Sequence, residues 1–268
     1  MMGARAASSS PAVDSLTVAT RVVFFGSIPV ARECLELLHG REDLEVVGVC
    51  AVPLEGWRQD QSVWDWCKTI GLALIEHEDI AQLRPDLGLS VRYHRILDDS
   101  VLRLFPLGVV NVHGGLLPEY RGSYCNVHAI INDEREYGIT LHYLDPGVDT
   151  GDVVDTSSVM VGPDDTGMTL YLAGESLTVD LVRRNLPELL RGTANRTPQS
   201  ELIAAGATPR TYRRGDAEAL REITVAEIST PRALRIVRAF DSPHHEPAFT
   251  VMDGRKVYLR LNAVPERR

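Results

Sequence analysis

Asn111 and His113 carry the side chains of this sequence that are best suited to chemistry. They lie in the run Val109–His113, which stops at the two glycines Gly114-Gly115. Because side chains alternate across a strand, the amide and the imidazole project from one face and the neighbouring valines from the other. In an open α/β sheet, ligands bind where the strands end. We therefore predict a reactive site at the end of this strand.

A second polar segment, Asp145–Asp152, adds the carboxylate of Asp149. Attack on a carbonyl carbon produces an oxyanion, which an amide N–H or a protonated imidazole stabilises. A carboxylate can accept the proton that the attacking group loses. We therefore predict that the two loops meet and form an acyl-transfer site. Each residue alone has a simpler explanation, because polar residues at strand ends often bond loop backbone and Asp-Thr-Gly-Asp favours a turn.

The elements that position these residues follow from the hydrophobic pattern. A strand at 21–25, a helix from Pro29 to Gly40 and a strand at 44–52 form a β-α-β unit, which predicts a parallel sheet. Further strands are expected at 72–75, 87–93, 109–113, 139–144 and 153–161, the last two antiparallel to each other. Further helices are expected at 62–71, 98–104, 127–132 and 164–191, with Pro187 kinking or dividing the last, and a charged turn is expected at 133–138.

The composition changes beyond Gly192 and divides the chain. Residues 1–19 are expected to be a disordered leader, 20–192 an N-terminal catalytic domain, and 193–268 a linker with a small C-terminal subdomain. Within that last part, helices are expected at 217–223 and 231–240, and Asp253-Gly254 predicts a hairpin. The predicted fold class is α/β, with a Rossmann-like, parallel-rich sheet, flanking helices and a C-terminal helix and β-hairpin subdomain.

Composition and charge narrow the class of protein. The 268 residues are 44% apolar and carry a formal net charge of −9, which disfavours a nucleic-acid partner because binding phosphates usually needs a basic face. No apolar run approaches the ~20 residues of a membrane span, and the N-terminus lacks the apolar core of a signal peptide. The four cysteines are widely spaced, without a CxxC pair. We therefore expect a cytoplasmic enzyme that binds neither nucleic acid nor membrane.

Several motifs in one order resemble the folate-dependent formyltransferase family. These are the opening strand-turn-helix at 25–31, Asn-x-His at 111–113, Leu-Pro at 117–118, Arg-Gly at 121–122, Gly-Ile-Thr-Leu-His-Tyr at 138–143 and Gly-Val-Asp-Thr-Gly at 147–151. The resemblance covers roughly residues 21–190. It implies the formyltransferase fold, N10-formyltetrahydrofolate as co-substrate, and a catalytic set of Asn111, His113 and Asp149.

The resemblance also implies where the two substrates bind. Donor contacts fall on the segments 93–97 and 143–148, much of them through backbone groups; the residues concerned are Tyr93, Ile96, Leu97, Tyr143, Asp145, Gly147 and Val148. Acceptor contacts are assigned to Ser27, His94, Arg95, Tyr124 and Asn126. The sequence departs from its relatives at Gly114-Gly115, where many have Pro-Ser or Ala-Ser, and this removes a hydroxyl near the site.

The segments 121–128, 143–149 and 236–249 look closest to sugar N-formyltransferases, although Cys125 and His128 replace a common Pro and Trp. Chain length and acidity also favour a small acceptor. The expected acceptor is a primary amine, foremost that of a nucleotide-linked amino sugar. A hydroxyornithine-type or other natural-product amine is the alternative, and we include a homodimer among the expected assemblies.

Other features have competing explanations. Arg210, Arg213 and Arg214 flank Tyr212, and a solvated linker is favoured over binding of nucleotide phosphates. The consecutive histidines 244–245 lack zinc spacing, so we predict no metal site. Trp57, Trp64 and Trp66 are interpreted as packing residues, with Trp57 the best candidate for another role.

Two rival classes are a dinucleotide-binding oxidoreductase and a non-catalytic ligand-binding module. The oxidoreductase would need a glycine-rich fingerprint after the first strand, where Gly26 stands alone. The module is disfavoured because Asn111, His113 and Asp149 are all present.

Overall fold

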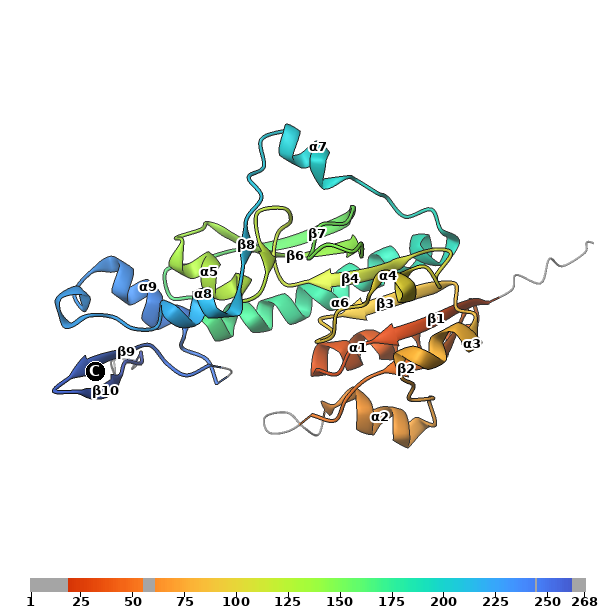
Figure 1. Ribbon diagram of the computed structural model, residues 1–268, viewed down its shortest axis with the longest axis horizontal. Coiled ribbons are helices and arrows are strands. Elements are labelled where there is room, and N and C mark those ends of the chain that lie inside the picture. The colour runs from red at the N-terminus through yellow and green to blue at the C-terminus, as the bar shows by residue number, and fades with distance from the viewer. Residues whose placement is uncertain (1–18, 55–60, 244, 262–268) are drawn as a thin grey trace, which may run out of the picture.

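A computed structural model describes residues 19–54, 61–243 and 245–261. Its centre is a six-stranded sheet in the order β2-β1-β3-β4-β6-β7 (Figure 1). Strands β1, β2, β3 and β4 are parallel to one another, and β6 is antiparallel to both of its neighbours, β4 and β7. The strands are β1 (Thr20–Phe25), β2 (Leu44–Cys50), β3 (Leu87–Val91), β4 (Val109–His113), β6 (Glu136–Tyr143) and β7 (Val153–Met160). The predicted parallel-rich α/β class is confirmed. The predicted leader up to residue 18, Trp57 and His244 lie outside the described residues.

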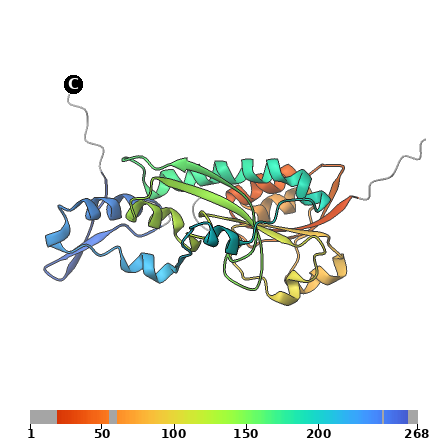
Figure 2. The ribbon, with the colours of Figure 1, turned by 90° about the horizontal axis from the view of Figure 1, so that it is seen from above.

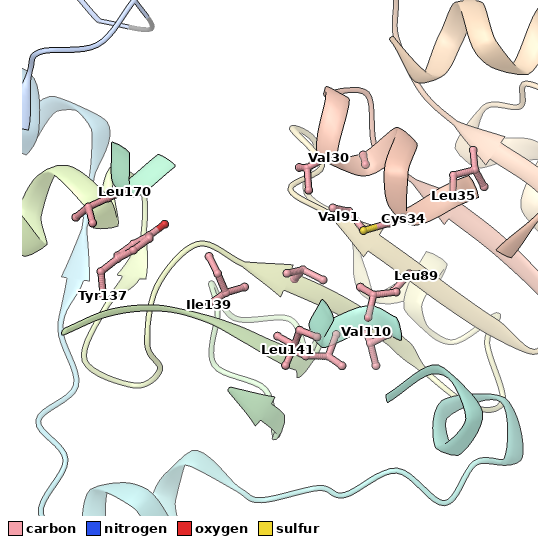
Figure 3. Packing of buried hydrophobic residues seen from close by; sticks show 14 of the residues in the cluster. Val30, Cys34, Leu35, Leu89, Val91, Val110, Tyr137, Ile139, Leu141 and Leu170 are labelled. Carbon is pink, nitrogen blue, oxygen red and sulfur yellow. The ribbon is translucent and has the colours of Figure 1, made fainter. Parts of the chain in front are cut away.

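Helices cover both faces of the sheet because the central strands are apolar on both sides. Phe24 packs in one buried cluster with residues of α1 (Pro29–Leu38) and α6 (Gly167–Arg191). Phe25, its neighbour on the pleat, packs in a second cluster with residues of α3 (Ile80–Leu83) and α4 (Asp99–Leu102). Figure 3 shows the first cluster, where α1 side chains approach those of β3 and β4. Strands buried on both faces are typical of parallel sheets.

Three local predictions differ from the structure. Pro187 does not divide helix α6, which is continuous from Gly167 to Arg191 and keeps Leu181, Leu186 and Leu190 buried on both sides of that residue; the alternative that Pro187 kinks the helix stays a prediction. The predicted strand at 72–75 is reduced to one bridge between Leu74 and Val49. The charged turn predicted at 133–138 is shorter, since β6 already begins at Glu136 opposite Met160 of β7.

The first helices of the chain lie beside β1 and β2. Helix α2 (Val63–Ile70) packs on α1 and begins at Ser62, whose hydroxyl accepts a hydrogen bond from Asp65 N. It ends at Gly71, which has the left-handed conformation typical of a helix C-terminus. The helix predicted at 62–71 is thus confirmed.

The C-terminal part contains more structure than the sequence indicated. The predicted linker carries helix α7 (Gln199–Ala204) and strand β8 (Thr211–Tyr212), and β8 pairs with β5 (Arg121–Gly122). Helices α8 (Arg214–Ala219) and α9 (Pro231–Ala239) follow, and the predicted hairpin is present as β9 (Phe249–Met252) and β10 (Arg255–Tyr258). The domain boundaries stay a prediction.

Helix α5 (Cys125–Ile131) packs against α9 and so joins the C-terminal elements to the sheet. Figure 2 shows α6 lying along the sheet, and its first residue, Gly167, is beside Ala239 of α9. In the described part of the chain, no helix combines the length and apolarity needed to cross a membrane.

Candidate active site

The end of β4 positions Asn111 through contacts on both neighbouring strands. Ser90 Oγ on β3 donates a hydrogen bond of 2.8 Å to Asn111 Oδ1. On the other side, the antiparallel register places His142 of β6 opposite Asn111, with Nδ2 and Nε2 3.3 Å apart. The Ser90 contact fixes the amide orientation, because its oxygen must face the hydroxyl. One N–H of Nδ2 faces His142 Nε2, and the second N–H is left to bind a ligand in the cavity that Asn111 lines.

Asp149 reaches the same place from the loop after β6, and has a positive φ of 52°. Its Oδ2 accepts a 2.8 Å hydrogen bond from Gly122 N and lies 3.4 Å from His113 Nδ1. Its Oδ1 lies 3.6 Å from His142 Nε2. The structure thus brings Asn111, His113 and Asp149 together. It adds His142, which sequence reasoning missed because the register that places it opposite Asn111 is set only in the folded sheet.

The hydrogen-bond partners of His113 determine what the pair with Asp149 can do. His113 Nε2 is 2.6 Å from Tyr120 O, so it carries the proton and donates to that carbonyl. In the neutral imidazole, Nδ1 is then unprotonated, and its lone pair faces the Asp149 carboxylate. A further proton between Nδ1 and Oδ2 would turn this contact into a hydrogen bond. The pair is therefore arranged to accept one proton.

The direction of each pKa shift agrees with that arrangement. Burial lowers the pKa of His113 below its ordinary value, although the nearby Asp149 opposes the shift. Burial alone would raise the pKa of Asp149, but the His142 and His113 imidazoles and the N–H of Gly122 lower it to about 2. Near neutral pH the resting pair is thus an ionised carboxylate and a neutral imidazole. Burial also raises the pKa of the adjacent Cys125 thiol to about 12, which excludes a resting thiolate there.

Helix α7 stabilises the loop that carries Asp149. The side chain of Gln199 is only 4% exposed, and its Nε2 donates hydrogen bonds of 2.9 Å to both Asp149 O and Gly151 O. Its Oε1 accepts two hydrogen bonds from Arg121, at 3.0 Å from Nε and 2.6 Å from Nη2. Sequence reasoning missed Gln199 because it stands in the predicted linker, where no local pattern indicated a contact.

Two cavities meet at these residues. The larger cavity has a volume of about 660 Å³ and is bounded by segments around Arg92, His113, Tyr124 and Arg214. The smaller cavity, about 210 Å³, lies between the segments 95–97 and 144–149. Tyr93, Asn111 and Asp149 line both cavities. The reactive side chains thus stand at the junction, where groups bound in the two cavities could touch.

The residues predicted to bind the donor gather mainly at the smaller cavity. Those that line it are Tyr93, Ile96, Leu97, Asp145, Gly147 and Val148. Ile96 and Val148 are 84% and 55% exposed, so two apolar side chains project at its mouth. Tyr143 lines neither cavity, because its buried ring packs beneath the guanidinium of Arg196, 3.5 Å from the ring centre.

The residues predicted to bind the acceptor are divided. His94, Tyr124 and Asn126 line the larger cavity, whereas Arg95 lines the smaller one and forms an ion pair of 3.0 Å with Glu76. Ser27 lines neither, because its buried hydroxyl accepts a hydrogen bond from Val52 N at the ends of β1 and β2.

The three arginines around Tyr212 do not act as one group. Arg214 lines the larger cavity, with its guanidinium 5.8 Å from the ring centre of Tyr124. Arg213 stands at the N-terminus of α8, and Arg210 lines a separate recess beside Tyr120. No group of three or more His, Cys, Asp or Glu suited to a metal ion occurs among the described residues.

Comparison with known proteins supports the resemblance. Residues 75–184 match the sequence model of the family described as formyl transferase, and this segment holds Asn111, His113 and Asp149. A methionyl-tRNA formyltransferase of Methylacidiphilum infernorum is 36% identical over 130 residues, which are 48% of this chain and 41% of that protein. The chain thus spans less than half the length of this curated relative.

Solved structures share the fold over nearly the whole chain. A 4-N formyltransferase from Francisella tularensis superposes with a TM-score of 0.74 at 20% identity, covering 90% of this chain and 97% of the other. An N-formyltransferase from Helicobacter canadensis, in complex with folinic acid and dTDP-3-aminofucose, has a TM-score of 0.72 at 19% identity, covering 90% and 86%. The fold is therefore that of formyltransferases.

Proposed function

We propose that this chain, which carries a formyl transferase segment within the fold of that family, is a folate-dependent N-formyltransferase. It would transfer the formyl group of N10-formyltetrahydrofolate to a primary amine. The observation that carries the proposal is the junction of the two cavities at Asn111 and Asp149. A group-transfer enzyme needs two substrates whose reacting atoms meet beside catalytic side chains.

The smaller cavity suits the folate donor. The apolar side chains of Ile96 and Val148 at its mouth offer packing surface for a flat pterin ring. Backbone of the segment 144–149 supplies N–H and C=O groups for the ring edge, and such mixed apolar and polar linings are typical of cofactor sites. The Helicobacter canadensis protein, which has this fold, was crystallised with folinic acid.

The junction residues can perform the transfer. As the amine nitrogen bonds to the formyl carbon, it must lose a proton, and the bond from that carbon to N10 breaks as N10 gains one. The ionised Asp149 and the neutral His113 can take up the first proton between Oδ2 and Nδ1, directly or through one water. The remaining N–H of Asn111 Nδ2 can stabilise the negative charge on the formyl oxygen. Residues 20–192 would carry this reaction, and the segment beyond them completes the acceptor side through Arg214.

For the acceptor we propose the amine of a nucleotide-linked amino sugar. The net charge of −9 disfavours a long nucleic-acid partner, and the larger cavity is enclosed mainly by polar residues. The Helicobacter canadensis structure contains dTDP-3-aminofucose. The second candidate is methionyl-tRNA, because the curated relatives bear that name. A hydroxyornithine-type amine is a further candidate.

Incubation of the protein with N10-formyltetrahydrofolate and a panel of amines tests the proposal. The panel contains dTDP-linked amino sugars, hydroxyornithine, glycinamide ribonucleotide and methionyl-tRNA. One member of the panel is expected to gain the mass of one formyl group, and the amount of formylated product should equal the amount of tetrahydrofolate released. Neither product is expected with an Asn111→Ala variant.

The absence of transfer to every amine would contradict the proposal. Thermal shift then separates the rivals, since stabilisation by NAD supports an oxidoreductase and stabilisation by neither NAD nor a folate analogue supports a binding module of another kind.

A further inference from the structure

Arg92 directly follows β3 and places its guanidinium in the larger cavity. Its Nη1 is buried and has no hydrogen-bond partner among the described residues. The other evident contact of the guanidinium is the face of Tyr171 on α6, 5.0 Å from the ring centre. A buried N–H without an acceptor is costly, and this one belongs to a group that carries a full charge. In the part of the chain that the structure describes, Arg92 Nη1 therefore has no acceptor.

The backbone of Arg92 also indicates a functional position. Its φ of 50° lies in the left-handed region, which an arginine rarely adopts. Non-glycine residues in this conformation cluster at active sites and ligand-binding sites, where the surrounding structure maintains them. Asp149, the carboxylate of the same cavity, has a similar φ of 52°.

Gly114 provides the space that this guanidinium occupies. A Cβ added at Gly114 would lie 3.1 Å from Arg92 Nη2 and 3.6 Å from Cζ. Gly114 does not have the positive φ that would itself require glycine. A side chain at 114 would therefore oblige the guanidinium of Arg92, which lies beside the residue that follows His113, to shift. The departure of the sequence at Gly114 and the presence of Arg92 are two parts of one feature.

We infer that Arg92 binds an anionic group of the acceptor, a carboxylate or a phosphate, close to the amine that is formylated. The inference rests on the proposed function. A guanidinium presents paired N–H groups that match the oxygens of either anion. Arg214, at the same cavity, has a side chain that is 74% exposed and can meet a ligand at the entrance. Arg92, in contrast, is half-buried, with its guanidinium beside Gly114.

The test compares Arg92→Gln with the wild-type protein and with Arg103→Gln. Arg103 is a matched control, because its side chain is 77% exposed, pairs with Asp99 on α4 and lines neither cavity. Inorganic phosphate and acetate are titrated as probes, by thermal shift and as inhibitors that compete with the amine the wild type formylates. We expect at least one probe to bind the wild type and Arg103→Gln, and Arg92→Gln to lose that binding.

The kinetic result follows from the same contact. For the formylated amine, kcat/KM is expected to fall by about 10- to 100-fold in Arg92→Gln, the range for a lost hydrogen bond to a charged group. Binding of a folate analogue should not change, because Arg92 does not line the smaller cavity. Competition by phosphate but not acetate assigns a phosphate, and the reverse assigns a carboxylate. Arg92→Lys should recover part of the loss because it keeps the charge.

Several results would overturn the inference. They are an unchanged kcat/KM in Arg92→Gln, or no competition by either anion with the wild type. If Arg92→Gln does not fold, Gly114→Ser gives the answer, because its side chain would displace the guanidinium, and unchanged anion competition there refutes the role. If the wild type formylates no amine at all, the proposed function fails, and phosphate and acetate binding still decides whether Arg92 is an anion site.

Discussion

The two cavities that meet at Asn111 are built in different ways. The smaller one is bounded by two short segments, 95–97 and 144–149, whose contribution is backbone and apolar side chains. The larger one collects charged and polar side chains from segments that are far apart in the chain, among them Arg92, His113, Tyr124 and Arg214. Under the proposed function, the smaller cavity would bind the donor through backbone and apolar surface, while the larger one would bind the acceptor through charged and polar side chains.

The difference also separates what a substitution should do on each side. A backbone-lined cavity tolerates side-chain exchange, whereas a cavity lined by charged groups loses specificity when one charge is removed. Residues at the junction serve both sides, so their substitution should affect the transfer itself. The following predictions test this division in order of decreasing effect.

The largest effect is expected for Asp149→Asn at the junction. The amide has nearly the shape of the carboxylate but cannot accept the amine proton, so kcat should fall on the order of 10²- to 10⁴-fold. Single-turnover formyl transfer measures the loss, and equilibrium dialysis with folinic acid should show retained donor binding. Turnover close to wild type would show that the proton goes elsewhere.

Asn111→Ala should lower kcat on the order of 10²- to 10³-fold, the usual cost of a lost oxyanion donor. His113→Ala should lower kcat on the order of 10²-fold or more, because it removes the imidazole that shares the amine proton with Asp149. Circular dichroism and thermal melts should show that both variants fold.

Gln199→Leu tests the support of the Asp149 loop, because it removes the hydrogen bonds to Asp149 O and Gly151 O at a residue that lines neither cavity. A smaller loss in kcat is expected there, with KM for the donor unchanged; a full loss of folding would instead make Gln199 a stability residue.

On the smaller cavity, Val148→Ala and Ile96→Ala should raise KM for the donor several-fold and leave KM for the amine unchanged. Burying such a side chain contributes about 1.5–3 kcal/mol when complete, and these side chains would be only partly covered by a ligand. Initial rates with each substrate varied in turn measure both constants. Equal changes in the two KM values would break the division between the cavities.

The smallest effect is a pH dependence of stability at His113. Its pKa is lowered in the folded protein, so below the ordinary value of 6.5 the unfolded chain binds a proton that the folded chain does not. The free energy of unfolding should therefore fall as the pH drops, by about 1 kcal/mol between pH 7.5 and 5.5 from this residue.

His113→Asn should lack this part, whereas the contributions of His77 and His128, whose pKa values are also lowered, remain. Urea unfolding at the two pH values measures the difference. An equal pH dependence in both proteins would mean that the pKa of His113 is the same in the folded and the unfolded chain.

The residues at the junction of the two cavities are the part of the site that local sequence predicts. The strand 109–113 placed Asn111 and His113 on one face because the period of a strand is two, and the polar segment after β6 supplied Asp149. Tyr143 is predicted to contact the donor from its place beside the segment 144–148, but its ring packs under Arg196 and lines neither cavity. Ser27 was drawn to the acceptor side by its place after β1, but its hydroxyl is used by Val52 N.

The sequence by itself determined the elements and the residues that a single element presents together. Hydrophobic period, glycine breaks and the hairpin signal at Asp253-Gly254 act over a few neighbouring residues, so they can be read without knowing the fold. Only the tertiary structure decided that His142 lies beside Asn111, that Gln199 supports Asp149, and that Arg92 fills the space above Gly114. These contacts join segments far apart in the chain, and their geometry depends on strand register and helix packing that no local pattern contains.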